Sequence, residues 1–207
     1  MSARRVVLAS HNPGKLVELR RILEPDVPGI EVLGLDDIGD FDEPVEDQPT
    51  FEGNALLKAR AAAKTTGLPS LADDSGLCVD ALNGMPGVLS ARWSGKPQGD
   101  KRSADTRNNA LLLDQLADVP DERRGAEFRC AMALVLPSGA EVVELGVMRG
   151  RIQWEPTGDG GFGYDPLFAA DGYDVSTAEL TPADKDAISH RGKALRAMVP
   201  HLVALLA

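Results

Sequence analysis

Apolar and polar positions along the chain predict alternating strands and helices. Residues 4–9, in which two arginines precede the apolar run 6–9, are predicted to form a buried strand. Asn12 and Pro13 follow it, and these residue types are preferred at a helix N-cap and at the first helical position. The pattern therefore predicts a strand, a turn and a helix that extends to about Leu23.

A second helix is predicted to begin near Thr50 and to stop at Gly67, because small and apolar residues recur between them at helical spacing. The preceding residues, 36–49, are acidic and contain proline, which indicates a loop. After the helix we expect a short strand that ends in an acidic turn, Leu71-Ala72-Asp73-Asp74-Ser75-Gly76.

The middle of the chain carries the clearest β pattern. Glycine, proline and polar residues dominate residues 84–105 and predict mostly loop, followed by a helix over about 104–117 that Pro120 closes. Residues 126–136 and 140–152 flank the short turn Pro137-Ser138-Gly139, so they are predicted to form a long antiparallel hairpin.

The C-terminal part is predicted to be helical. A capping signal, Thr181-Pro182-Ala183-Asp184, precedes a helix from about His190, which Pro200 is expected to kink. The pattern as a whole predicts an α/β protein in which helices pack on a mixed sheet. At 207 residues, 43% of them apolar, we expect one compact unit with a substantial core.

Composition favours a cytoplasmic protein. The longest apolar runs are far shorter than the roughly 20 residues that a membrane helix needs, and residues 6–9 are too few for the core of a signal peptide. Cys78 and Cys130 show no CxxC spacing and no disulfide framework, which suits a reducing compartment.

The net charge of −10 argues against an extended nucleic-acid surface, which would need many lysine and arginine contacts to phosphate. An anionic substrate would have to be small, and held by local cations or by a metal that bridges it to carboxylates. Acidity that serves only solubility is the alternative.

The segment Ser10-His11-Asn12-Pro13-Gly14-Lys15 is a candidate phosphate loop. A polar loop that enters a helix presents free backbone amides and the positive end of the helix dipole to an anion. Lys15 would then reach a phosphate. The segment is not a Walker A loop, and a well-capped helix with a surface lysine explains it equally.

The acidic turn is a candidate metal site, because Asp73 and Asp74 follow a predicted strand. Mg²⁺ prefers oxygen ligands and is usually held by one or two carboxylates together with substrate phosphates. Glu46, from the acidic loop, would complete the site. One aspartate would also accept a proton from an attacking water. A plain turn without a ligand is the alternative.

The glycine-rich loop Gly160-Gly161-Phe162-Gly163-Tyr164-Asp165-Pro166 is a candidate base-binding segment. Its glycines let the backbone approach a ligand closely, and Phe162 offers a flat face to a purine. The alternative is a tight turn anchored by packed rings.

Lys185 and Ser189-His190-Arg191 form a further candidate, in which cations lie near a helix N-terminus and Arg191 offers several N–H donors to a carbonyl or a phosphate. The alternative is a surface position, which is usual for a lone His-Arg pair on a helix. No Cys/His cluster supports zinc, and no GxSxG motif supports a serine hydrolase.

Taken in order, these motifs resemble those of the inosine triphosphate pyrophosphatase family over about residues 6–195. The matching segments are residues 10–15, 50–58, 71–76, 160–165 and 189–192. The resemblance implies a magnesium-dependent enzyme that converts deaminated purine nucleoside triphosphates such as ITP, dITP and XTP to the monophosphate and pyrophosphate. It also implies an elongated, mixed twisted sheet flanked by helices, two lobes with a central active-site cleft, and a homodimer.

The resemblance further implies roles for individual residues. Asp74 would be the proton acceptor and, with Glu46, a magnesium ligand, while Asp73 supports the site. The family commonly has a small residue at the position of His11. The residues that would bind the substrate are Ser10, His11, Asn12, Pro13, Gly14, Lys15, Lys58, Ser75, Phe162, Gly163, Tyr164, Asp165, Lys185, His190 and Arg191.

The expected reaction is in-line attack of water on the α-phosphorus, in which positioning and charge neutralisation dominate. Arg191 would donate to the 6-oxo group of a deaminated purine, whereas the 6-amino group of adenine would face it with donors. Two rival functions remain: a non-catalytic nucleotide-binding protein, and a phosphatase that releases orthophosphate.

Overall fold

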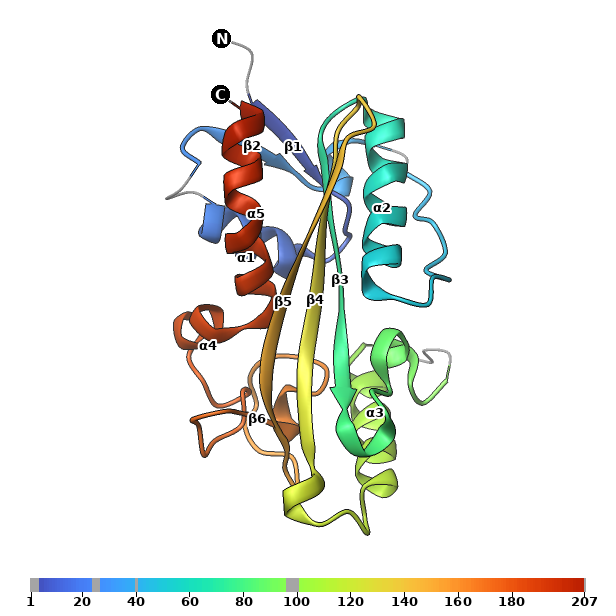
Figure 1. The fold of residues 1–207 in the computed structure, drawn as a ribbon, viewed down its shortest axis with the longest axis vertical. Helices are drawn as coiled ribbons and strands as arrows, with labels where there is room; N and C mark the ends of the chain where they lie inside the picture. Colours follow the sequence, from blue (N-terminus) through green and yellow to red (C-terminus); the bar gives the residue numbers. More distant parts are fainter. Residues whose placement is uncertain (1–3, 24–26, 40, 96–100, 207) are drawn as a thin grey trace. The chain divides into compact units, whose positions relative to one another are not determined.

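The computed structural model describes residues 4–23, 27–39, 41–95 and 101–206 (Figure 1). Six described strands form one mixed sheet in the order β2-β1-β3-β4-β5-β6, with helices packed on it. The strands are β1 (Arg4–Leu8), β2 (Ile30–Leu33), β3 (Ser70–Val79), β4 (Gly125–Val135), β5 (Glu141–Ile152) and β6 (Phe168–Ala170). The α-helices are α1 (Pro13–Leu23), α2 (Phe51–Thr66), α3 (Lys101–Gln115), α4 (Pro182–Ile188) and α5 (His190–Leu206). The predicted α/β class is confirmed.

The chain divides into two compact units. The first comprises Met1–Asp74, Cys130–Gly146 and Arg191–Ala207, and the second comprises Ser75–Arg129 and Val147–His190. Each unit has its own apolar core, described below. That the two units act as a single catalytic domain stays a prediction.

In the first unit, β1 pairs in parallel with β2, where Val6 lies opposite Val32, and with β3, where Leu8 lies opposite Leu71. Side chains from these strands, from β4 and from helices α1 and α5 share one core. Its fully buried members include Leu8, Leu23, Leu71, Leu195 and Met198.

Helix α2 begins and ends where its sequence predicts. The side chain of Thr50 accepts a hydrogen bond from the amide of Gly53, as an N-cap does. Gly67 closes the helix in the left-handed conformation, with φ of 65°, which only glycine adopts without cost.

The second unit has a separate core, in which the C-terminal part of β3 packs with α3, β4, β5 and β6. Its members include Leu77, Leu112 and Phe168. Arg124 is 1% exposed there, and its guanidinium donates to the carbonyl oxygens of Leu116 (2.8 Å) and Ile152 (2.9 Å). These bonds satisfy a charged group that would otherwise be costly to bury.

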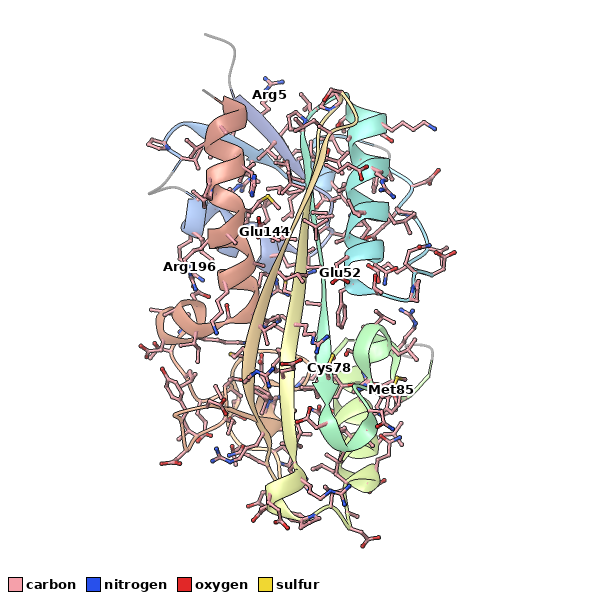
Figure 2. All side chains as sticks on the ribbon, in the orientation of Figure 1. Arg5, Glu52, Cys78, Met85, Glu144 and Arg196 are labelled. Carbon is pink, nitrogen blue, oxygen red and sulfur yellow. The ribbon has the colours of Figure 1, made fainter. Side chains whose placement is uncertain are left out.

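Cys78 on β3 lies close to the turn that contains Met85, since the amide of Val79 donates to the carbonyl of Met85 (3.1 Å; both labelled side chains are shown in Figure 2). Cys78 and Cys130 are both buried, and neither forms a disulfide in the described structure. No helix in the described part of the chain is long and apolar enough to cross a membrane.

The predicted acidic turn is wrong. Asp73, Asp74, Ser75 and Gly76 all lie inside β3, which continues to Val79. The sequence suggested a turn because these residue types are frequent in turns. In the fold, cations and amide groups from neighbouring elements satisfy the two carboxylates, so the strand does not have to end there.

Other boundaries also differ from the expectation. Helix α3 begins at Lys101 and ends at Gln115, and a 3₁₀-helix, Gly87–Arg92, interrupts the predicted loop. Helix α5 continues through Pro200 to Leu206. Strands β2 and β6 were not predicted, because 4 and 3 residues are too few to show an alternating pattern.

Candidate active site

The site in the first unit is built around two adjacent carboxylates of β3. Consecutive side chains of a strand point to opposite faces of the sheet. Asp73 and Asp74 therefore meet different neighbours although they are adjacent in sequence. Asp73 is 2% exposed, whereas Asp74 is only partly buried.

Asp73 is held between two cations. Its Oδ1 lies 2.9 Å from Nζ of Lys15, at the start of α1, and its Oδ2 accepts from Nε of Arg191 on α5 at 3.1 Å. Burial by itself would raise the pKa of Asp73, but Lys15, Arg191 and Lys58 outweigh that effect and hold the pKa far below its usual value. Asp73 is therefore a permanent anion that ties α1 and α5 to β3.

Lys58 of α2 lies 5% exposed between acidic groups. Its Nζ donates to the backbone carbonyl of Asp73 (2.8 Å) and to Oε1 of Glu46, with which it forms a close ion pair. Burial lowers the pKa of this ammonium, but Asp73, Glu46 and Asp74 together raise it above its ordinary value. Lys58 is thus a buried cation that holds the acidic loop against β3.

Asp74 receives a neutral partner. Nδ2 of Asn54 donates to its Oδ2 at 2.9 Å. Asn54 and Lys58 are four residues apart on α2 and so share one face of the helix. The pKa of Asp74 is raised, chiefly by burial and further by Glu46, against the opposing effects of Lys58, Asn54 and Lys15. Asp74 thereby gains affinity for a proton while Asp73 loses it.

The candidate phosphate loop is ordered by its own side chains. Oγ of Ser10 accepts from the amide of Asn12 (3.2 Å), and Oδ1 of Asn12 accepts from the amide of Gly14 (3.0 Å), which is the capping bond expected from the sequence. Nδ1 of His11 lies 3.6 Å from Oδ1 of Asp36, and both side chains are exposed.

Residues Gly160–Asp165 of the second unit form a tightly bonded loop centred on Asp165, which is 4% exposed. Its Oδ2 accepts from the amide of Phe162 (2.8 Å) and pairs closely with Nζ of Lys185, while Oγ1 of Thr177 donates to its Oδ1 (3.0 Å). The ring of Phe162 is 47% exposed, and Nζ of Lys185 lies 5.2 Å from its centroid. The loop therefore presents an aromatic face beside a lysine.

Tyr164 and His190 have different surroundings. Tyr164 is 4% exposed in the core of the second unit, and its hydroxyl donates to the carbonyl of Ser90 at 2.9 Å. What Tyr164 can offer a ligand is therefore its backbone. The ring of His190 is stacked on Phe128, with centroids 5.0 Å apart and an interplanar angle of 12°.

The donor set suits Mg²⁺ better than a transition metal. Glu46 and Asp74 provide carboxylate oxygens, the ligands that Mg²⁺ prefers. After burial, the negative charge of Glu46 is a further cause of the raised pKa of Asp74. Within the described residues, no group of three or more His, Cys, Asp and Glu side chains could hold a metal ion. The residues present fit a site with two protein ligands that substrate phosphates complete.

Comparison with known proteins shows the family of the chain. The Ham1 family matches residues 6–201 of the chain. The chain belongs to the Ham1 family. Among its relatives, the dITP/XTP pyrophosphatase of Nocardia farcinica is 61% identical, over 99% of this chain and 98% of the relative, and that of Frankia alni is 60% identical over 93% and 94%.

Solved structures of the Ham1 family show the same fold. A HAM1 protein from Coxiella burnetii is 40% identical and superposes with a TM-score of 0.87 over 97% of this chain and 98% of that chain. A nucleoside-triphosphatase, dITP/XTP pyrophosphatase, from Mycobacterium abscessus is 55% identical, with a TM-score of 0.77 over 95% and 99%.

Within this Ham1 chain, the structure groups most of the residues predicted from the sequence. The first unit brings together Lys15, Glu46, Lys58, Asp73, Asp74 and Arg191. The second unit brings together Phe162, Asp165 and Lys185, and it also contains Ser75 and His190. Pro13 begins α1.

Sequence analysis missed three polar residues that hold these groups. Asn54 bonds Asp74, and Asp105 and Asn109 of α3 bond Gly163. Helical spacing offered a signal in both helices, because Asn54 lies four residues before Lys58 and Asp105 four before Asn109. Only the fold shows that Asn54 and Lys58 bond to Asp74 and to the Asp73 carbonyl, and that Asp105 and Asn109 bond to the backbone of Gly163.

Proposed function

We propose that the chain is a nucleoside triphosphate pyrophosphatase that removes deaminated purine nucleotides such as ITP, dITP and XTP from the nucleotide pool. It hydrolyses each triphosphate to the nucleoside monophosphate and pyrophosphate. The names of its relatives, dITP/XTP pyrophosphatases at 54–61% identity, support this activity. The observation that carries it is the unequal surroundings of the adjacent carboxylates, with Asp73 bound to two cations and Asp74 bonded to an amide.

Asp74 is the proton acceptor of the proposed reaction. Water attacks the α-phosphorus, its proton passes to a carboxylate oxygen of Asp74, and the bond from the α-phosphorus to the oxygen bridging to the β-phosphate breaks. Pyrophosphate leaves with that oxygen. A carboxylate already paired with two cations accepts a proton poorly, so Asp73 is the worse base of the two. Two adjacent carboxylates with such different environments are typical of sites where each has its own task.

Glu46 and Asp74 would hold a divalent cation, proposed to be Mg²⁺, which neutralises phosphate charge when it is bound. Lys58 keeps the acidic loop in reach by its pairing with Glu46. Lys15 is oriented by Asp73, and since an ammonium group has three donors, that contact leaves capacity for a phosphate oxygen.

The base is proposed to bind the loop that carries Phe162. Stacking on its ring contributes about 1–3 kcal/mol and is tolerant of base identity. Discrimination between bases would come from hydrogen bonds to the 6-oxo group. Arg191, oriented by Asp73, is the donor that the sequence predicts for this group. A guanine base has the same 6-oxo group, so a further contact must disfavour GTP.

One assay tests this function against its rivals. The protein is incubated with MgCl₂ and with ITP, XTP, GTP or ATP in turn, and the released anion is identified. Pyrophosphate from ITP and XTP is the expected product. Orthophosphate would indicate a phosphatase, and binding without release a regulatory protein. Hydrolysis of GTP as efficient as that of ITP and XTP would rule out the pool-cleansing role.

The substitution Asp74→Asn tests the assigned base. It keeps the size of the side chain and can keep a hydrogen bond with Asn54, but an amide cannot accept the proton. We expect turnover of ITP to fall by about 10²–10⁴-fold with an unchanged circular dichroism spectrum. Asp118→Asn, at an exposed position outside both groups, is the matched control. Wild-type turnover by the Asp74→Asn protein would contradict the assignment.

We also propose that the protein works in the cytoplasm, since a chain with two cysteines and no CxxC spacing suits a reducing compartment, and that it forms a homodimer. Sedimentation velocity at micromolar concentration tests the second point, and a purely monomeric protein would exclude it.

A further inference from the structure

In the second unit, two side chains of α3 bond both backbone polar groups of one residue, Gly163. Oδ2 of Asp105 accepts from the amide of Gly163 at 2.8 Å, and Nδ2 of Asn109 donates to the carbonyl of Gly163 at 3.0 Å. Asp105 and Asn109 are one helical turn apart, so they project from the same face of α3. The helix therefore forms hydrogen bonds to both the amide and the carbonyl of Gly163.

The conformation of Gly163 explains why it needs such support. Its φ of +63° is left-handed, and apart from its two chain neighbours no described residue lies within 4 Å of a Cβ built at this position. A glycine has more conformational freedom to lose than any other residue. Held by two bonds, it fixes the direction in which the chain leaves Phe162 on one side and enters Tyr164 on the other.

The neighbouring residues are fixed independently of α3. Asp165 accepts from the amide of Phe162 (2.8 Å), and the hydroxyl of Tyr164 donates to the carbonyl of Ser90 (2.9 Å). The loop is thus bonded at every residue from Phe162 to Asp165, while the Phe162 ring itself stays 47% exposed. A rigid backbone with an exposed aromatic ring is suited to a ligand rather than to a solvent-facing turn.

The side chain of Asn109 leaves one of its polar atoms without a hydrogen bond, which lowers the stability of the folded state. It is 9% exposed, and in the described structure its Oδ1 is buried without a hydrogen-bond partner. A buried acceptor that lacks a partner destabilises the fold. The bond to the Gly163 carbonyl is therefore the contribution that this asparagine makes, and an apolar residue of similar size would fill the space without the unsatisfied oxygen.

We propose that Asp105 and Asn109 are positioning residues for the purine base, which act by holding Gly163 so that Phe162 and Asp165 keep their orientation. The inference rests on the proposed function, in which this loop binds the base. Neither residue is expected to contact the triphosphate or to take part in proton transfer. Their loss should weaken the binding of the base and leave the chemical step nearly unchanged.

The test compares a ligand that has a base with one that lacks it. α,β-Methylene-ITP contains the base but resists cleavage at the α-phosphorus, and inorganic tripolyphosphate contains only the phosphates. Their dissociation constants are measured by calorimetry with MgCl₂ for the wild type, Asp105→Ala, Asn109→Leu and the double variant. Asp105→Asn retains an acceptor for the Gly163 amide and serves as the conservative rescue. Asp114→Ala, at an exposed position of the same helix, is the matched control.

We expect each single variant to bind α,β-methylene-ITP on the order of tenfold more weakly, as the loss of one hydrogen bond predicts. Tripolyphosphate should bind as it does to the wild type. In kinetics with ITP, KM should rise while kcat stays within about threefold of the wild type. Asp105→Asn should recover most of the affinity, and Asp114→Ala should behave as the wild type.

Equal weakening of both ligands would show a general structural role and overturn the inference, as would unchanged binding of α,β-methylene-ITP. Should Asp105→Ala not fold, Asn109→Leu still decides, because leucine has a similar volume and removes both the unsatisfied Oδ1 and the donor to the Gly163 carbonyl. Its circular dichroism spectrum is expected to match that of the wild type. A wild-type protein that neither binds α,β-methylene-ITP nor hydrolyses ITP would refute the proposed function itself, and the inference with it. That result is recognised before any variant is made.

Discussion

At Asp73 and Asp74, two identical side chains that are adjacent in the chain acquire opposite properties. Lys15 and Arg191 come from positions 58 residues before and 118 residues after Asp73, and they lower its pKa. Asn54 meets Asp74, whose pKa is raised by burial. The resemblance to a known family already predicted Asp74 as the base, and the physical difference between the two carboxylates depends on which face of β3 each side chain occupies.

Lys58 is the residue whose removal should best test the proposed metal site. Lys58→Met leaves the Asp73 carbonyl without its donor and Glu46 without its cation, so we expect the free energy of unfolding to fall by about 1–3 kcal/mol. Mg²⁺ between the carboxylates would replace the missing positive charge. Added MgCl₂ should therefore raise the thermal midpoint of Lys58→Met more than that of the wild type.

The control is Lys64→Met, at an exposed position of the same helix, which should change neither the midpoint nor its response to MgCl₂. Equal responses of Lys58→Met and the wild type would argue against a cation site formed by Glu46 and Asp74.

Glu179 gives a pH prediction away from the site. Its carboxylate accepts from the amide of Ser176 (2.9 Å) and from the hydroxyl of Thr157 (2.8 Å), and these bonds lower its pKa. A carboxylate with a lowered pKa in the folded state stabilises it above the ordinary glutamate pKa of about 4.3, and this contribution disappears as the pH falls through the folded value.

Glu179→Gln should therefore have a lower thermal midpoint than the wild type at neutral pH. The difference should shrink as the pH falls below about 4. Glu155→Gln, at an exposed position, is the control. A difference that stays constant down to the most acidic pH at which the protein folds would show that the charge of Glu179 is not the cause.

Elements with local signals were predictable, and elements without them were not. Helix α2 carries its own N-cap at Thr50 and its own stop at Gly67, so local chemistry determines both ends. Strands β2 and β6 are short, and they exist because β1 and β5 offer them a hydrogen-bonding edge. Such pairing partners are distant in sequence, and periodicity does not reveal them.

The pairing of β5 with β6 depends on Gly150, which lies opposite Ala170. A Cβ at Gly150 would overlap the Ala169 carbonyl oxygen and would lie 2.7 Å from Cζ of Phe168 and 2.9 Å from Cα of Ala170. Because backbone atoms cannot move aside as a flexible side chain can, we expect Gly150→Ala to lower the free energy of unfolding by about 1–3 kcal/mol or more.

Urea titration followed by circular dichroism measures this change. Leu145→Ala, on the same strand at a position that is 57% exposed, is the control and should stay within about 0.5 kcal/mol of the wild type. If Gly150→Ala were as stable as that control, the close approach of β6 to β5 would not require a glycine at position 150.

For the whole molecule, the net charge of −10 limits the partners that the proposed site can have. The buried cations Lys58 and Arg191 are bonded to acidic groups, so they give no continuous basic surface. We expect no binding of duplex DNA in fluorescence anisotropy at low salt, where such binding is strongest. Micromolar affinity that declines steeply with added salt would contradict this expectation.

The sequence by itself determined the α/β class, the ends of α2 and the motifs that identify the family, because each depends on neighbouring residues or on composition. Only the tertiary structure decided that the two aspartates lie within a strand, that Asp73 pairs with Lys15 and Arg191, and that Asp105 and Asn109 grip Gly163. The physical reason is distance along the chain. Hydrogen bonds and charges act through space over a few ångströms, and the partners that set the properties of these side chains lie up to 118 residues away.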